Sequence, residues 1–211
     1  MSCIERKGGH LIVISGPSGV GKGTICREFF SRNMKNISPS VSATTRKPRL
    51  GETNGINYIF ESMEQFESMT RNNQLLEYAS VHGNYYGTPK EFVFEQMKAG
   101  NDVILEIDIQ GATQVKKNYQ EAVLIFIMPP TFGDLVKRIR NRGTENAEEI
   151  KKRLSNAHAE ILAADHYDYI VVNDNIFDAT DNVEAVIMSE RCKRDRYILD
   201  FNSFIYKEAQ K

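Results

Sequence analysis

A glycine-rich segment with one lysine has the composition and spacing of a phosphate-binding loop. Its residues are Gly16, Pro17, Ser18, Gly19, Val20, Gly21, Lys22, Gly23 and Thr24. The apolar run 11–14 precedes it and the amphipathic run 25–30 follows it, so the predicted order is strand, loop, helix. Glycines let successive backbone N–H groups surround phosphate oxygens, and the helix dipole and the lysine add positive charge. We therefore expect the chain to bind a nucleoside triphosphate.

A pair of arginines, Arg46 and Arg49, flanks a proline that stiffens the backbone. Guanidinium groups bind phosphate oxygens in bidentate fashion. On composition alone, a solvated basic loop is an equal alternative. Because the pair follows a phosphate-binding loop, we interpret it as a clamp for a second phosphorylated substrate.

Two carboxylates, Glu106 and Asp108, end the apolar run 103–108, which we expect to be a strand. Residues two apart in a strand share a face, so both acids would point toward the sheet edge where ligands bind. Ordinary strand-end charge is the alternative. In the loop, Gly23 separates the lysine from Thr24, whereas a hydroxyl residue normally follows the lysine and ligates Mg²⁺. We therefore expect no direct protein ligand, and Mg²⁺ held through phosphates and waters near Thr24 and Glu106.

A basic run at 137–143 precedes a polar segment, and Arg153 follows it. Arg138 and Arg142 are four residues apart and can share one helix face. Runs of this kind are usually solvated. Asn173 follows the last apolar run, where an Asn is also an ordinary turn residue.

Bulk composition excludes several classes of protein. The 211 residues fit one domain, with 41% hydrophobic and 26% charged residues and a net charge of −1, so general attraction to nucleic acid or membranes is not indicated. Three scattered cysteines favour a reducing compartment over a disulfide framework. The first residues lack a signal-peptide core and no apolar run is long enough to span a membrane. We expect a cytoplasmic protein.

The apolar pattern predicts an α/β fold with a parallel sheet covered by helices on both faces. We expect strands at 11–15, 103–108, 122–128 and 168–172. We expect helices at about 22–33, 62–71, 89–99, 110–118, 131–141, 146–164 and 178–198. The polar region 38–88 reads as an inserted, partly β lobe, and 141–149 as a small lid.

Six stretches taken together resemble the guanylate kinases, which are P-loop nucleoside monophosphate kinases, over nearly all of residues 9–190. They begin at Gly16, Thr44, Gly83, Glu106, Arg140 and Val171 and read GPSGVGKGT, TTRKPR, GNYYGT, EIDIQG, RNRGTE and VVND. The resemblance implies a single domain over 1–211. Its parts would be a P-loop core at about 9–37, 89–140 and 156–198, a mixed GMP-binding lobe at 38–88, a lid at 141–155 and a tail at 199–211.

The resemblance also implies the reaction, transfer of the γ-phosphoryl group of ATP to GMP with Mg²⁺, in purine nucleotide metabolism. It implies that the GMP site consists of Ser42, Arg46, Arg49, Tyr58, Glu77, Tyr86, Thr88 and Asp108. Among these, Ser42, Glu77 and Thr88 would read the base. For ATP it implies the loop 16–24 with Arg138 and Asn173. The groups that neutralise charge during transfer would be Lys22, Arg46, Arg49, Arg142 and Arg153.

The chemistry of the guanine base explains why a carboxylate would be used at Glu77. Without the resemblance, we would interpret this residue as part of a surface helix. Guanine offers N1–H and N2–H₂ side by side, and one carboxylate can accept both. Adenine has no such donor pair on that edge, so a buried Glu77 would stay unpaired against it.

Two other functions remain open at this point. Catalytically inactive scaffolds share this domain, although Lys22, Arg142 and Arg153 are all present here. The second alternative is another small P-loop kinase, which would act on AMP, UMP or an alcohol. The oligomeric state, the use of dGMP and the role of 199–211 are not legible from the sequence.

Overall fold

The computed structural model describes residues 4–81, 83–140 and 147–201, without the side chains of 147–154. The strands are β1 (Ile4–Arg6), β2 (Leu11–Ser15), β3 (Ile37–Pro39), β4 (Ala43–Thr44), β5 (Ile59–Phe60), β6 (Leu75–Val81), β7 (Asn84–Pro89), β8 (Asp102–Glu106), β9 (Val123–Met128), β10 (Tyr169–Val172) and β11 (Tyr197–Leu199). The α-helices are α1 (Lys22–Ser31), α2 (Met63–Arg71), α3 (Lys90–Lys98), α4 (Ile109–Asn118), α5 (Phe132–Arg140), α6 (Ala147–Leu162) and α7 (Ile176–Arg191). Two short 3₁₀ turns, η1 (Ala163–His166) and η2 (Arg194–Arg196), complete the described elements.

A five-stranded parallel sheet in the order β10–β9–β2–β8–β3 forms the centre of the core. Every residue of β2 is buried, as in a strand with helices on both faces. Its side chains alternate, so Ile12 and Ile14 belong to one hydrophobic cluster and Leu11 and Val13 to the other. This is the α/β fold expected from the apolar runs.

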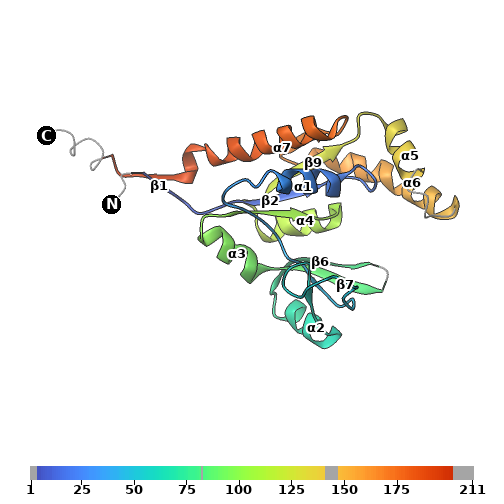
Figure 1. Cartoon of the computed structure of the whole chain (residues 1–211), viewed down its shortest axis with the longest axis horizontal. Helices are drawn as coiled ribbons and strands as arrows, with labels where there is room; N and C mark the ends of the chain where they lie inside the picture. The colour runs from blue at the N-terminus through green and yellow to red at the C-terminus, as the bar shows by residue number, and fades with distance from the viewer. Residues whose placement is uncertain (1–3, 82, 141–146, 202–211) are drawn as a thin grey trace, which may run out of the picture.

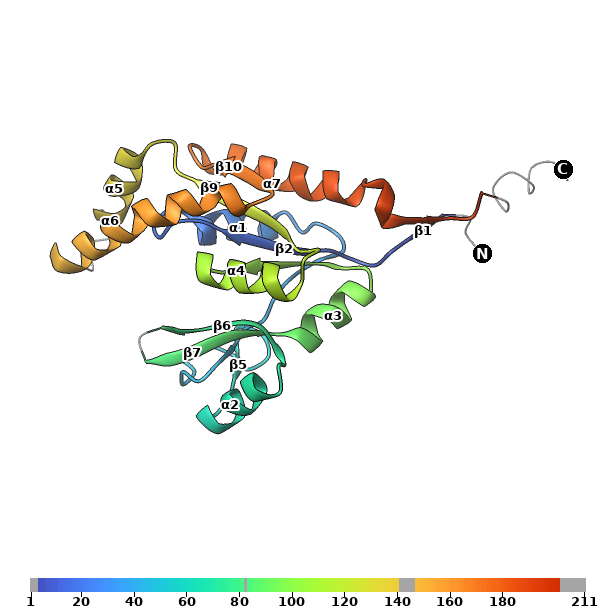
Figure 2. The ribbon, with the colours of Figure 1, turned by 180° about the vertical axis from the view of Figure 1, so that it is seen from behind.

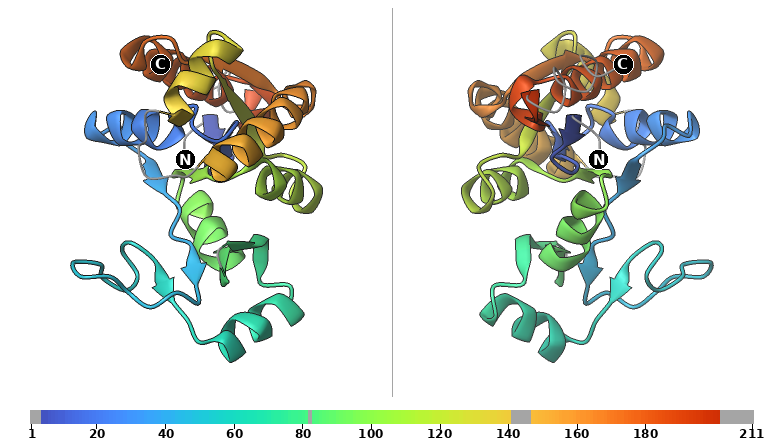
Figure 3. Two further views of the ribbon diagram at one scale, coloured as in Figure 1. Left: turned by 90° about the vertical axis from the view of Figure 1, so that its right-hand side faces the viewer. Right: turned by 90° about the vertical axis from the view of Figure 1, so that its left-hand side faces the viewer.

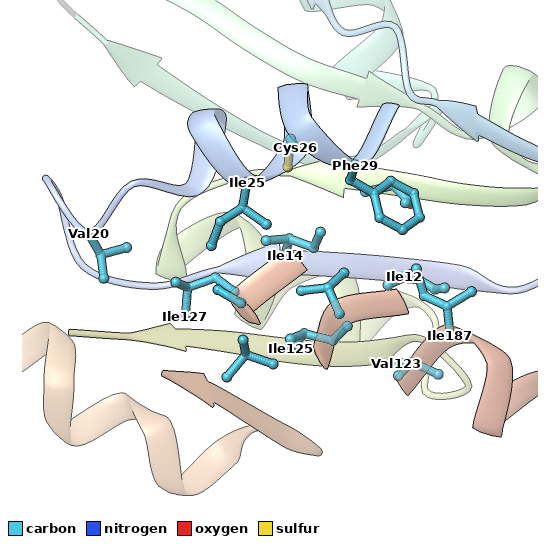
Figure 4. Close-up of a cluster of buried hydrophobic side chains, with 14 of the residues drawn as sticks. Ile12, Ile14, Val20, Ile25, Cys26, Phe29, Val123, Ile125, Ile127 and Ile187 are labelled. Atoms are coloured by element: carbon cyan, nitrogen blue, oxygen red, sulfur yellow. The ribbon is translucent and has the colours of Figure 1, made fainter. Parts of the chain in front are cut away.

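The helices divide between the two faces of the sheet. On one face, α1 and α7 pack on β2 and β9, with Ile25, Phe29 and Ile187 fully or almost fully buried against Ile12 and Ile125 (Figure 4). On the other face, α3 and α4 cover the sheet through the second cluster. The layers are visible end-on in Figure 3.

A separate four-stranded mixed sheet, β5–β4–β7–β6, and helix α2 make up the lobe below the core (Figures 1 and 2). Helix α2 begins with a capping box, in which Ser62 and Gln65 satisfy each other's backbone N–H groups. Helix α4 lies between lobe and core, and its Gln114 side chain bonds both the backbone N–H and the carbonyl of Tyr78, at 3.1 and 3.0 Å. The lobe is therefore joined to α4 by direct hydrogen bonds.

The phosphate-binding loop leaves the sheet at Gly16, and this position requires glycine. Its φ is +146°, and a Cβ there would lie 2.4 Å from the carbonyl oxygen of Ile127. The carboxyl ends of β2, β8, β9 and β10 lie at one edge of the sheet, because their pairing is parallel. The candidate side chains gather at that edge.

The structure corrects two predictions and adds a strand to the core sheet. The strand expected at 103–108 ends at Glu106, and Asp108 is the N-cap of α4. The helix expected at 178–198 ends at Arg191, because the chain then forms β11 and pairs antiparallel with β1. Strand β3, which pairs with β8, was not predicted as a strand.

Among the described residues, no helix has the length and hydropathy needed to cross a membrane.

Candidate active site

The phosphate-binding loop closes onto the first turn of α1. Gly21 is the N-cap, with φ +102°, and Lys22 is the first helical residue. The Lys22 ammonium group donates to the carbonyl oxygens of Gly16, at 2.7 Å, and Pro17, at 3.3 Å. Burial lowers the pKa of Lys22, and the nearby carboxylates of Glu106, Glu160 and Asp108 oppose this shift. The lysine thus lies inside the loop where a phosphate chain would pass.

Two residues from distant elements brace this loop at one atom, the carbonyl oxygen of Val20. The Asn173 amide donates to it at 2.7 Å and the Arg138 guanidinium at 3.2 Å. Arg138 also donates to the Asn173 carbonyl at 2.9 Å. A Cβ on Gly21 would lie 2.6 Å from Nδ2 of Asn173, so the close approach needs glycine. The structure brings together both residues expected on the ATP side.

The two expected acids differ in their surroundings. Glu106 is exposed at the end of β8, beside α1, and a Cβ on Gly23 would lie 3.1 Å from its Oε1. Burial, together with the Glu106 carboxylate, raises the pKa of the Cys26 thiol. Asp108 instead caps α4, because its Oδ1 accepts a hydrogen bond from the Gly111 N–H at 2.8 Å. Glu106 therefore lies beside the first turn of α1, whereas Asp108, whose charge also acts on Lys22, is bound at the start of α4.

A buried carboxylate lies between the lobe and α4. Glu77 in β6 is 6% exposed and Thr88 in β7 is fully buried. The Thr88 hydroxyl donates to Oε1 of Glu77 at 2.7 Å. Burial raises the pKa of Glu77 to about 7, although the hydrogen bonds from Thr88 lower it. Ala43 pairs with Gly87, and this register brings Ser42 level with Thr88.

An arginine framed by aromatic rings forms the second part of the lobe site. The Arg46 guanidinium lies 5.2 Å from the ring centre of Tyr58, and the rings of Tyr58 and Tyr86 are 6.0 Å apart. Arg46 forms a bidentate ion pair with Glu52, at 2.9 and 3.0 Å. The Arg49 side chain is exposed nearby in the chain. Four residues expected to hold one phosphate are thus found in one region of the lobe.

The site therefore combines a phosphate-binding loop with a buried carboxylate and an arginine clamp. Residues 8–190 match the family model of guanylate kinase. The chain belongs to the guanylate kinase family. Family membership makes it a nucleoside monophosphate kinase, a phosphotransferase, as the resemblance indicated.

Individual relatives agree with the family match. The chain is 53% identical over 188 residues to the guanylate kinase of Clostridium tetani, with 89% of each chain covered. It is 48% identical over 205 residues to the guanylate kinase of Halalkalibacterium halodurans, with 97% of this chain and 100% of the other covered. The crystal structure of guanylate kinase from Anaplasma phagocytophilum has a TM-score of 0.71 at 32% identity, with 92% of both chains covered.

The structure does not place the side chains of two arginines that the resemblance to guanylate kinases assigned to phosphoryl transfer. Arg142 and the side chain of Arg153 lie outside the part of the chain that the structure describes. Thr24 is exposed on the first turn of α1, and its hydroxyl oxygen accepts a hydrogen bond from Arg27 at 3.1 Å.

Two carboxylates that contact the site were missed at the sequence level. Oε2 of Glu160 in α6 accepts a hydrogen bond from the loop N–H of Ser18 at 3.0 Å. No local pattern points to this contact, because the residues are 142 positions apart. Glu52 had a usable signal, since it follows Arg49 by three residues with a glycine between them, as in a tight turn.

Proposed function

We propose that this guanylate kinase converts ATP and GMP to ADP and GDP with GMP held in the lobe and ATP on the loop 16–24. The observation that carries the assignment is Glu77, a buried carboxylate whose Oε1 is held by Thr88. A buried carboxylate is costly unless donors fill its acceptor positions, and a carboxylate has more of these than Thr88 occupies. Guanine supplies a pair of donors through N1–H and N2–H₂, whereas adenine does not.

The GMP phosphate would lie against Arg46 and Arg49, with the hydroxyls of Tyr58 and Tyr86 beside it. Ser42 and Thr88 would complete the base contact, and Asp108 would lie near base and ribose. Because Asp108 caps α4 through Oδ1, only its other oxygen is free of that bond. The positions of these residues, in the lobe and at the start of α4, support a GMP site between the two.

Phosphoryl transfer demands positioning and charge neutralisation more than covalent chemistry from the protein. A GMP phosphate oxygen would attack the γ-phosphorus in line. Lys22 would hold the outer phosphates of ATP, while Arg46 and Arg49 fix the attacking phosphate. We assign the neutralisation of charge on the transferred group to Arg142 and Arg153. Arg138 and Asn173 hold the conformation of the loop by donating to the Val20 carbonyl. The adenine would lie on the same side of the site as these two residues.

The residues beside the loop fit Mg²⁺, which prefers oxygen ligands and keeps several waters. The Thr24 hydroxyl and the Glu106 carboxylate offer such oxygens along the first turn of α1. Within the described ranges, His, Cys, Asp and Glu side chains do not gather in a group of three that would bind a metal directly. Bound Mg²⁺ would neutralise phosphate charge, and Thr24 and Glu106 would hold its waters.

We further propose a lid at 141–155 and a lobe at 38–88 that close on the substrates. Closure would exclude water, so that ATP is not hydrolysed. The free thiols of Cys26 and Cys192 support a reducing, cytoplasmic setting.

The test is ADP formation by the protein and by Lys22→Ala, with and without GMP. We expect GMP-dependent turnover by the protein and its loss, by at least a thousandfold, in Lys22→Ala, with unchanged GMP binding and circular dichroism. Near-normal turnover by Lys22→Ala would refute the role of the loop. Folded protein that binds GMP without any turnover would instead identify a scaffold.

A further inference from the structure

Glu52 occupies a fixed place beside the two arginines of the lobe. The backbone N–H of Glu52 donates to the Arg49 carbonyl at 3.1 Å, which closes a four-residue turn. Gly51, the third residue of that turn, has φ +87°, as a type II turn requires there. In return, Oε2 of Glu52 accepts from the Arg49 N–H at 2.7 Å. The turn thus positions the carboxylate independently of Arg46.

The hydrogen bonds of Arg46 use one edge of its guanidinium group and leave the other. Nη1 donates to Oε2 of Glu52 at 3.0 Å and to the Lys47 carbonyl at 2.8 Å, and Nη2 donates to Oε1 of Glu52 at 2.9 Å. Arginine has five N–H donors. The two not used in these bonds, on Nε and Nη2, lie side by side and form a second fork that suits a phosphate.

Aromatic rings and neighbouring groups restrict the guanidinium further. Its carbon lies 5.2 Å from the ring centre of Tyr58 and 5.8 Å from that of Phe60. The Arg46 side chain is 14% exposed and that of Glu52 is 19% exposed. Hydrogen bonding to Glu52 is the main cause that raises the pKa of Arg46, and the Tyr86 hydroxyl adds to it. The guanidinium group is thereby held next to Tyr86.

We propose that Glu52 is the positioning residue of the GMP phosphate site, which holds Arg46 by one edge and so presents its other edge to the phosphate. The inference rests on the proposed function, because it takes Arg46 as a phosphate ligand. It gives Glu52 a role that requires no contact with GMP.

The alternative is that Glu52 occupies the place of the phosphate and must leave when GMP binds. The geometry opposes this, because the carboxylate uses the Nη1–Nη2 edge and the Nε–Nη2 edge is not used by it. The two readings predict opposite effects of removing the charge. Under our proposal, Glu52→Gln weakens binding of the phosphate, and under displacement it strengthens that binding.

Isothermal titration of GMP and guanosine separates the phosphate contribution from base recognition. Guanosine lacks the phosphate, so the ratio of its Kd to the Kd of GMP measures what the phosphate adds. We expect Glu52→Gln to reduce this ratio about ten- to a hundredfold, the range for a hydrogen-bonded charge. The guanosine Kd should stay within about twofold. Glu52→Asp, which keeps the charge but is one methylene shorter, should give an intermediate ratio.

Two comparisons complete the experiment. Glu67→Gln removes an exposed carboxylate of the same lobe, 3.9 Å from Arg71, and should leave the ratio unchanged. In an Arg46→Ala background, Glu52→Gln should add little, because the effect passes through Arg46.

The outcomes are distinguishable. An unchanged or larger ratio in both Glu52 variants overturns the proposal and leaves the proposed function standing. An equal loss of guanosine and GMP binding also overturns it, because Glu52 would then support the lobe as a whole. If the unaltered protein binds guanosine as tightly as GMP, the phosphate site itself is refuted, and both proposals fail.

Discussion

Thr88 donates its hydroxyl proton to Oε1 of Glu77, at 2.7 Å, inside the lobe. The bond fixes the orientation of the carboxylate and fills one of its acceptor positions. Glu77 keeps Oε2, which lies 3.0 Å from the position of a Cβ on Gly111 at the start of α4. Burial raises the pKa of Glu77 to about 7, so the group titrates where enzymes are normally assayed.

Guanosine binding should depend on pH through Glu77. Only the ionised carboxylate can accept both N1–H and N2–H₂, and the fraction ionised falls about tenfold per pH unit below a pKa of about 7. We expect the Kd of guanosine to rise about tenfold between pH 8 and pH 6. Guanosine is preferred to GMP here, because a phosphate monoester also titrates, near pH 6.

The matched variant for this experiment is Glu77→Gln. It cannot ionise, so its guanosine Kd should be higher at pH 8 and should change little with pH. If the unaltered protein also shows a flat profile, Glu77 is not the group that accepts the base protons.

The Thr88 hydroxyl should control both affinity and titration of Glu77. Thr88→Val keeps the shape but removes the donor, which should raise the guanosine Kd about five- to tenfold. Since the Thr88 hydrogen bond lowers the pKa of Glu77, its loss should shift the pH profile to higher pH. Thr113→Val, at an exposed threonine of α4, is the control. If Thr88→Val weakens guanosine binding but leaves its pH profile unshifted, Thr88 does not act through the ionisation of Glu77.

Asn173 should affect ATP and leave GMP binding unchanged. Its amide is 5% exposed and holds the Val20 carbonyl at 2.7 Å. Asn173→Ala should raise the KM for ATP about tenfold, the value of one buried hydrogen bond, with the KM for GMP within about twofold. The control Asn175→Ala removes the N-cap of α7 and should lower stability by about 1 kcal/mol without changing either KM. Equal increases in both KM values for Asn173→Ala would indicate general loss of structure.

A buried charge cluster far from the substrates should affect stability alone. Asp102 is fully buried and accepts hydrogen bonds from Arg6, from Arg191 and from both the backbone and the ring of His10. Burial raises its pKa, but the bonds from His10 and Arg191 outweigh this and bring the pKa to about 2. Asp102→Asn should therefore cost about 3–5 kcal/mol at neutral pH.

The sign of the pH effect follows from the lowered pKa. An ionised Asp102 stabilises the native state above the unfolded pKa of about 4, and this stability is lost as the pH falls toward 2. The difference between Asp102→Asn and the unaltered protein, from urea unfolding, should be about 1 kcal/mol smaller at pH 3 than at pH 7. A difference that is the same at both pH values would show that Asp102 does not act through its charge.

Local patterns were sufficient for the loop and for every strand of the core sheet except β3. The glycine spacing, Lys22 and the flanking apolar and amphipathic runs all lie within 20 residues, and the structure has the strand, loop and helix that they predict. The pair of arginines pointed to a phosphate clamp in the same way, whereas Tyr58 and Tyr86 were assigned to it only through the resemblance to guanylate kinases. The contact of Glu160 with Ser18 was not predictable, since the two residues are 142 positions apart, whereas Glu52 lies close enough to Arg49 for the turn between them to be visible in the sequence.

The errors arose where distant residues decide the local structure. The sequence beyond Arg191 has a helical pattern, but the chain there forms a strand because Tyr197 pairs with Arg6, 191 positions earlier. Alternation along 103–108 cannot show where the chain leaves the sheet. A cap contact does show it, because Asp108 accepts from Gly111 and starts α4.

The most direct test of the account is ADP release with ATP, Mg²⁺ and each of GMP, IMP, AMP, UMP and CMP. IMP lacks only the 2-amino group of guanine, so its kcat/KM should be about ten- to a hundredfold below that of GMP, and the other three should be far lower. This order would support reading of the base by Glu77. Equal use of GMP and IMP, or preferred use of AMP or a pyrimidine nucleotide, would contradict it.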